Sequence, residues 1–459
     1  MLIRRCSVIP ILLTVWCAAP AATVSEKPRL IVLTDIGGDP DDTQSMIRLL
    51  VYSNEFEIEG LIASASGTPG ELGVNVVKPQ LIRELVDAYG MVGPNLLLHD
   101  HGFPTVDHLR ARIKVGNPNR GIENIGEGQD TEGSNWIVSA ADRDDPRPLS
   151  VAIWGGSTEL AQALWRVRRD RPAAEVARFV KRLRIYAIGH QDNTGPWIIG
   201  NFPDLFYILA KSAEGSDKRD SAYRGMYLGG EESLTTHDWI EENVLAGHGP
   251  LGALYPTKTW TAPNPHGVLK EGDTPSWFFF LPNGLGDPSH PEWGGWGGRF
   301  RPAYGGLFRD DADHIGGADD ARISVSRWRA AYQNDFAARM DWCVKPFAEA
   351  NHNPIAVAMV KQGRRTIKLD AKPGTRVQLS ADGSSDPDGD GLSYRWYVYR
   401  EAGSYRGDIT VRDSDQQRAE LTVPADSTGK SIHVILEVSD SGKSSLTAYR
   451  RVIVRGAAK

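Results

Sequence analysis

Four aspartates lie within eight residues directly after an apolar run, and this feature most constrains the fold. The run over residues 30–33 predicts a buried parallel strand, and the apolar residues at positions 46, 47, 49 and 50 predict one face of a helix. The acidic segment therefore forms a strand-to-helix loop, which in open α/β sheets lies where ligands bind. Its aspartates are Asp35, Asp39, Asp41 and Asp42.

Carboxylates this close repel one another, and a crevice of low dielectric holds them together when a cation neutralises them. Their hard oxygens suit Ca²⁺ or Mg²⁺, and Ca²⁺ fits better because it accepts roughly six to eight oxygens in irregular geometry. The alternative is a helix N-terminus with an acidic first turn, which would explain one or two of the aspartates. Four of them, with Gly37 and Gly38 between, favour a calcium site.

The N-terminal residues predict export. Arg4 and Arg5 precede an apolar segment over residues 8–16 and small residues over 18–22, the pattern of a secretory signal peptide over residues 1–22. The alternative, a membrane anchor, needs an apolar run of about 20 residues. We therefore expect a secreted or periplasmic protein without membrane attachment after cleavage, whose mature chain keeps Cys343 as its one cysteine.

The length and charge of the chain limit its organisation and its partners. A chain of 459 residues predicts at least two domains. The net charge of −6 is mild and there is no basic stripe, so no nucleic-acid partner is predicted. Cationic small molecules and neutral sugars stay equally open as partners.

Strands and helices alternate over residues 26–350. Strands are predicted over residues 56–64, 149–153 and 184–188, a helix over about 75–89, and mostly loop over 91–130. This rhythm predicts an α/β domain with a mostly parallel, doubly wound sheet. The loops that follow the strands should open on the same sheet edge as the aspartates.

Glycine and tryptophan are unusually frequent over residues 282–306, which include Trp293 and Trp296. The composition predicts either a structured loop that wraps a pocket or a flexible connector, and the aromatic density favours the structured loop. Two roles stay open for the rings, namely stacking on a sugar face and packing on the domain.

Short alternating strands separated by turns occupy residues 354–459, after a boundary near residues 349–354. About a hundred residues of this kind predict a β-sandwich. Asp386, Asp388 and Asp390 in one of its turns indicate a structural, Asx-rich turn, with a calcium site as the alternative. The predicted strands cover residues 376–379, 392–398, 419–423, 432–436 and 448–454.

The aspartate loop and the later turn Gly155-Gly156-Ser157-Thr158 resemble, in this order, the Asp-rich loop and the Gly-Pro-Leu-Thr-Asn turn of the nucleoside hydrolase superfamily. Segments at 271–276, 282–285 and 290–300 resemble a secreted bacterial branch of nucleoside hydrolase-like proteins, often labelled cellulose-binding. In that branch a PKD or immunoglobulin-like domain follows. The resemblance implies the sheet of a nucleoside hydrolase and, because members often dimerise or tetramerise, a homo-oligomer.

The resemblance also implies roles for acidic residues. In the superfamily an aspartate of the first loop is the general base, and its neighbours hold Ca²⁺ with a threonine carbonyl and a late aspartate. Asp238 follows a histidine, as the late aspartate of the superfamily does, and rivals Asp273 for that role. The roles carried over are Asp35 as ligand or base, Asp41 as the alternative base, Asp42 and Asp273 as ligands, and Thr158 as the carbonyl donor.

Further candidates lie in the loops that follow the predicted strands and in the glycine-rich segment. The candidate acids for the leaving group are His190, His248 and His290. For every candidate, a structural or surface role is the alternative. The candidate substrate contacts are Asp192, Asn193, Trp197, Glu292 and Trp293.

Two classes of function stay open. The first is an exported, Ca²⁺-dependent hydrolase of glycosidic bonds, and the second is a non-catalytic carbohydrate-binding or polysaccharide-binding protein on the same fold. The intact acidic loop favours the enzyme. A loop lengthened by Asp39 and Pro40, and Thr68 or Ser66 where the superfamily has a ribose-binding asparagine, favour a substrate other than a nucleoside.

Overall fold

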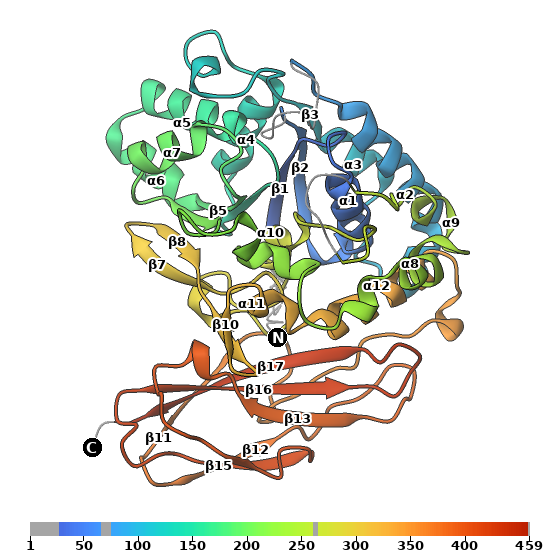
Figure 1. Cartoon of the computed structure of the whole chain (residues 1–459), viewed down its shortest axis with the longest axis vertical. Coiled ribbons are helices and arrows are strands. Elements are labelled where there is room, and N and C mark those ends of the chain that lie inside the picture. The colour runs from blue at the N-terminus through green and yellow to red at the C-terminus, as the bar shows by residue number, and fades with distance from the viewer. Residues whose placement is uncertain (1–26, 66–74, 260–264, 458–459) are drawn as a thin grey trace, which may run out of the picture.

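The structure is a computed structural model that describes residues 27–65, 75–259 and 265–457, so the predicted signal peptide, Ser66 and Thr68 lie outside the described residues. Its first part is built on an eight-stranded sheet with the order β3-β2-β1-β4-β5-β6-β8-β7 (Figure 1). Neighbouring strands are parallel, except that β7 runs antiparallel to β8 at one edge. The strands are β1 (Arg29–Thr34), β2 (Glu57–Ala63), β3 (Ile113–Val115), β4 (Leu149–Ile153), β5 (Leu183–Ile188), β6 (Phe206–Ala210), β7 (Phe300–Tyr304) and β8 (Leu307–Asp310).

Helices cover both faces of this sheet (Figure 1). Alternate residues of β1 face opposite cores, so that Leu30 and Val32 pack with α1, α2, α10 and α12, whereas Ile31 and Leu33 pack with α4 to α7. This arrangement confirms the predicted doubly wound α/β fold. The helices are α1 (Asp41–Val51), α2 (Pro79–His99), α3 (Val106–Arg112), α4 (Glu132–Asp142), α5 (Thr158–Asp170), α6 (Ala173–Arg182), α7 (Thr194–Asn201), α8 (His237–Ile240), α9 (Gly249–Gly252), α10 (Thr274–Phe278), α11 (Ile323–Ser326) and α12 (Arg329–Trp342).

The prediction of mostly loop over residues 91–130 was wrong for the first part of that segment. Helix α2 continues to His99 with Pro94 inside it, and α3 and β3 follow. The Gly-Pro-Asn sequence signals a break, but Leu96 on this last stretch is buried in the core, and the Asn95 amide donates to the carbonyl of Trp342 at 2.8 Å. Tertiary contacts therefore outweigh the local signal.

The C-terminal part is a β-sandwich of two packed sheets, as predicted. One sheet has the order β11-β17-β16-β13 and the other β12-β15-β14, and a common apolar core lies between them. A small hairpin, β9 (Asp313–Ile315) and β10 (Ala318–Asp320), precedes it. The sandwich strands are β11 (Ile367–Ala371), β12 (Arg376–Ser380), β13 (Ser393–Val398), β14 (Val411–Arg412), β15 (Arg418–Thr422), β16 (Ser431–Ser439) and β17 (Thr447–Gly456).

Besides the core inside the sandwich, one apolar cluster spans the sandwich and the α/β part. Strands β16 and β17 are largely buried on both faces, because Val434 faces the sandwich core whereas Ile435 and Tyr449 belong to the same cluster as α1 and α12. Figure 1 shows β17 lying directly beneath the helices of the first part. None of the described helices is both long and apolar enough to cross a membrane.

The glycine-rich segment is a structured loop between these two parts. Trp296 packs edge-on against Phe278 and Tyr449, with ring centroids 5.3 and 6.2 Å away. Trp293 is stacked on His290 at 3.9 Å. Of the two open roles for the rings, the structure shows packing on the protein.

Candidate functional site

The acidic loop joins the end of β1 to the start of α1. The hydroxyl of Thr34, the last residue of β1, donates to a carboxylate oxygen of Asp42, and the Ile36 amide donates to the same hydroxyl at 3.2 Å. Asp35 lies against Gly155, where a Cβ atom would come within 2.5 Å of the Asp35 carboxyl carbon. The glycine turn after β4 therefore makes room for Asp35.

Asp273 brings a further carboxylate to this loop from a distant part of the chain. One oxygen each of Asp41, Asp42 and Asp273 lies within 4.8 Å of the other two. Asp273 precedes α10 and is 3 % exposed, and its Oδ2 atom has no hydrogen-bond partner within the described residues. The structure thus assembles three of the carboxylates predicted from sequence. The rival, Asp238, is exposed on α8.

The segment that carries Asp273 is fixed by buried polar side chains of α1. The Gln44 side-chain oxygen accepts from the backbone amides of Lys270 and Glu271, at 3.0 and 3.1 Å. Arg48 is fully buried and forms an ion pair with Glu271, whose backbone adopts a positive φ of 43°. The same helix therefore presents Asp41 and Asp42 and positions their distant partner.

Lys270 belongs to the acidic cluster, although no pattern in the sequence predicted it. Its ammonium group pairs with Asp39 and lies 3.2 Å from an oxygen of Asp41. Burial alone would lower the pKa of Lys270, but the carboxylates of Asp41 and Asp39 outweigh it and raise that pKa. A lysine between apolar residues and Glu271 gives no local signal for this role, because its partners lie in the first loop.

The electrostatics of the cluster indicate that a further cation fits. Burial and the charges of Asp41, Asp42 and Asp35 raise the pKa of Asp273 well above its ordinary value. A carboxylate in such surroundings needs either a proton or a cation. The donor set consists of oxygens, with one buried oxygen unpartnered, and hard divalent cations such as Ca²⁺ prefer such ligands.

Asp192 and Thr158 form a second polar group beside the acidic loop. Asp192 accepts from the Thr158 hydroxyl at 3.0 Å, from the Ser157 amide at 3.0 Å and from the Thr194 hydroxyl at 2.6 Å. It therefore ties the β4–α5 turn to the β5–α7 turn, which is the structural alternative named above. Asn193 extends this group, because its side-chain oxygen accepts from the Ile122 amide at 2.8 Å.

Glu159, also missed from sequence, lies buried next to this group. One of its oxygens accepts from the Asn117 amide at 2.6 Å, and the other has no partner within the described residues. Burial raises the pKa of Glu159 to about 7, and the charge of Asp192 adds to this effect. The signal available in the sequence was an acid in the first turn after the Gly-Gly turn.

The remaining predicted residues lie elsewhere. His290 stacks on Trp293 and bonds Glu292 at 3.0 Å, and the Trp293 ring and carbonyl contact His433 and Arg451 of the sandwich. Trp197 lies on α7, where the Arg168 guanidinium is 5.2 Å from its ring centroid. These contacts place His290, Glu292 and Trp293 at the junction with the sandwich and Trp197 in the outer helical layer.

The other two histidine candidates also have surroundings of their own. Burial lowers the pKa of His190 to about 4, so at neutral pH its ring is uncharged. His248 bonds Asp341 of α12 at 3.2 Å. In the sandwich turn, Asp386 accepts from the amides of Asp388 and Asp390, at 2.8 and 3.1 Å, as in the predicted Asx-rich turn. Oxygens of these three aspartates also lie within 4.8 Å of one another, so the alternative of a calcium site stays a prediction.

A buried carboxyl at the end of β8 gives a pH-dependent prediction. Burial raises the pKa of Asp310 to about 6, although the Ser221 hydroxyl and the Ala222 amide donate to it. The folded chain thus holds this proton more tightly than the unfolded chain, so the stability that it contributes is present below about pH 4 and is lost as the pH rises through about 6.

Relative to wild type, Asp310→Asn should gain about 1–3 kcal/mol of unfolding free energy between pH 4 and pH 7.5. Urea titrations at both pH values measure it, with exposed Asp204→Asn as control, and an equal difference at both pH values contradicts it.

Comparisons with known proteins agree with the fold and the order of the domains. Residues 29–300 match the family model described as cellulose-binding Sde182, nucleoside hydrolase-like domain, and residues 376–456 match that of cellulose-binding protein Sde0182, C-terminal domain. A solved nucleoside hydrolase-related hypothetical protein from Saccharophagus degradans, described as associated with carbohydrate metabolism, is 35% identical. The TM-score is 0.76, over 94% of this chain and 100% of that chain.

Two other comparisons add no argument. The PKD domain from the KIAA 1837 protein is 18% identical over 20% of this chain and 83% of its own, with a TM-score of 0.16, so the PKD assignment stays a prediction. No curated protein matches the chain.

The fold is therefore that of a nucleoside hydrolase-like α/β protein with a C-terminal β-rich part. The chain belongs to the Sde182 family of cellulose-binding, nucleoside hydrolase-like proteins.

Proposed function

We propose that this protein is an exported, Ca²⁺-dependent hydrolase of glycosidic bonds that acts on a pentofuranoside, a nucleoside or a related glycan unit. The observation that carries the proposal is the buried, unpartnered oxygen of Asp273 within a cluster of carboxylates. Binding a neutral sugar does not by itself need such a cluster. Burying charged groups costs folding free energy, and catalytic sites are where such groups are typically found.

In this proposal Asp42, Asp273 and Asp35 hold the cation, with the Thr158 carbonyl as a further donor. A bound Ca²⁺ would orient the attacking water and two sugar hydroxyls and would lower the pKa of that water. Asp35 takes the proton as the water oxygen bonds the anomeric carbon, and the leaving group departs with the electrons of the glycosidic bond. Asp41 is the second choice as base, because Lys270 already pairs with it.

A second candidate function is non-catalytic carbohydrate binding on the same fold. The cellulose-binding description of the family model favours it, and so does Lys270, which already neutralises part of the acidic cluster. For either function we propose export through the N-terminal signal peptide.

Asp42→Ala distinguishes the two candidates. The variant should lose Ca²⁺ retention in metal analysis after gel filtration, and its turnover of a panel of aryl furanosides and nucleosides should fall at least about a hundredfold. Asp238→Ala, at the exposed rival position, is the matched control and should change neither quantity. A wild-type protein that is inert on the whole panel yet binds polysaccharide would contradict the proposed hydrolase activity and support non-catalytic carbohydrate binding.

A further inference from the structure

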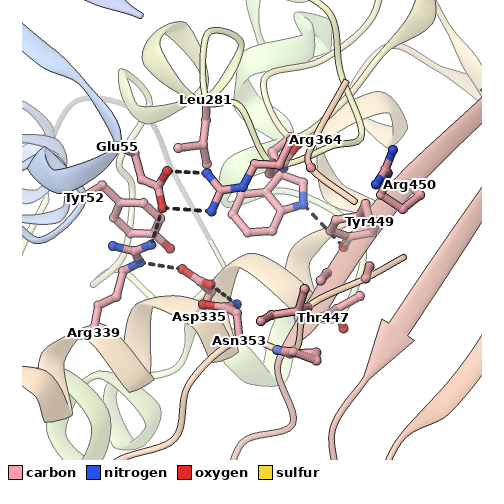
Figure 2. A pocket seen from close by; sticks show the side chains of 17 residues that line it. Tyr52, Glu55, Leu281, Asp335, Arg339, Asn353, Arg364, Thr447, Tyr449 and Arg450 are labelled. Atoms are coloured by element: carbon pink, nitrogen blue, oxygen red, sulfur yellow. Dashed lines mark hydrogen bonds and ion pairs between the residues drawn. The ribbon is translucent and has the colours of Figure 1, made fainter. Parts of the chain in front are cut away.

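A cavity of about 240 Å³ lies between the α/β part and the sandwich, away from the acidic loop. Its lining comes from Tyr52 and Glu55, which follow α1, from α12, from the segment between the two parts, and from β17 (Figure 2). None of the aspartates of the acidic loop lines it, nor does Lys270. The cavity is therefore a separate feature of the molecule.

One side of the cavity carries a continuous chain of planar polar groups (Figure 2). Glu55 accepts from Arg364 and from Arg339, the latter at 3.2 Å. Asp335 accepts from Arg339 at 2.9 Å and from the Asn353 amide at 2.7 Å. Each group holds its neighbour in place, so the polar wall is arranged before any ligand arrives.

The charges of Glu55, Asp335, Arg339 and Arg364 cancel within this wall, whereas Arg450 adds one positive charge to the lining. Two carboxylates alternate with two guanidinium groups, and the third lining arginine, Arg450, donates to the backbone carbonyls of Lys361 and Arg365, at 2.7 and 3.2 Å. A phosphate or another strongly charged ligand would have to compete with these partners. A neutral ligand with many hydroxyl groups fits better, since each hydroxyl can both donate to a carboxylate and accept from a guanidinium.

Aromatic side chains and an open amide complete the cavity. Trp296 and Tyr449 line it and are joined by an indole-to-hydroxyl hydrogen bond of 3.4 Å. Asn283 accepts from the Leu285 amide, and its own amide nitrogen has no partner within the described residues. Both rings are buried and pack edge-on against each other, so they give the cavity an apolar wall beside its directed polar groups, a combination that suits a sugar ring.

We infer that this cavity at the domain junction binds a neutral saccharide. Hydroxyl groups of the sugar exchange hydrogen bonds with the wall formed by Glu55, Arg364 and Asp335, and the Asn283 amide donates to the ligand. Because both parts of the chain contribute to the lining, the site exists only when the sandwich is docked. The inference goes beyond the proposed hydrolase and does not depend on it.

Isothermal titration calorimetry of the full-length protein with cellotetraose and xylotetraose tests whether the cavity binds a saccharide. Wild type should bind at least one of them, and Arg364→Ala and Asn283→Ala should each weaken binding at least tenfold. Arg365→Ala, an exposed arginine next in sequence that does not line the cavity, should bind within twofold of wild type. Circular dichroism checks that each variant is folded, and Asn283→Ala keeps the test valid if loss of the Arg364 ion pair unfolds the protein.

The results for the two sites are separable. Asp42→Ala, which removes the proposed cation site, should bind the saccharide as wild type does. Failure of wild type to bind either sugar overturns the inference, and so does binding by folded Asn283→Ala that equals that of wild type. Loss of saccharide binding in Asp42→Ala would also overturn it, because the sugar would then sit at the acidic loop.

Discussion

Asp273→Asn should stabilise the calcium-free protein and at the same time abolish its stabilisation by calcium. In the free protein the Asp273 carboxyl lies among Asp41, Asp42 and Asp35, with one oxygen unpartnered, so replacing it by a neutral amide relieves repulsion. We expect the free energy of unfolding without calcium to rise by about 1–3 kcal/mol. Removing a ligand has the opposite effect on the cation complex.

The size of the stabilisation by calcium can also be predicted. Calcium at a hundred times its dissociation constant should add about 2.7 kcal/mol to the unfolding free energy of wild type and close to nothing to that of Asp273→Asn. Denaturant titrations with EDTA and with calcium measure both arms, and exposed Asp238→Asn is the matched control. If calcium stabilises the variant as much as wild type, Asp273 is not a ligand.

Much of the fold follows from sequence because its signals are local. The apolar run before Asp35 and the periodic residues after it predicted β1 and α1, and the alternating strands predicted most of the sandwich. The misses are places where distant contacts decide. Helix α2 runs through Pro94 because Val92 and Leu96, on one face of its last turns, are buried in the core. Strand β16 is buried on both faces because the α/β part covers the face that an isolated sandwich would expose to water.

The residues of the candidate site also fall into those that the sequence predicted and those that only distant contacts bring in. The motif resemblance pointed to Asp42 and Asp273, which the structure brings together with Asp41. Nothing in the sequence around Lys270 indicates its place in the cluster, because its carboxylate partners lie in the first loop. For His290, the glycine-rich loop was predicted to wrap a pocket, and the structure packs that loop against the sandwich, so the role of His290 as an acid stays a prediction.

The junction between the two parts rests on a buried carboxylate as well as on apolar packing. Asp313 of the small hairpin is fully buried and accepts from Arg327 at 2.8 Å, from the Tyr399 hydroxyl at 2.6 Å and from Arg299 at 2.6 Å. Arg299 lies in the glycine-rich segment, and Tyr399 belongs to the sandwich. One aspartate therefore pairs with two arginines, which Asp311 and Glu401 also contact, and anchors the second part to the first.

Asp313→Ala should lower the free energy of unfolding by about 3–5 kcal/mol, because it leaves two arginines without a buried counter-charge and Tyr399 without its acceptor. Asp319→Ala is the matched control, since that aspartate belongs to the same hairpin but forms an exposed pair with His314. Exposed pairs contribute about 0–1 kcal/mol, so the control should stay within that range. Calorimetry and urea titration measure both variants. An Asp313→Ala protein as stable as the control would show that apolar packing alone joins the two parts, whereas a loss of the expected size would show that this carboxylate and the apolar packing together hold the sandwich, and with it the cavity at the junction, in place.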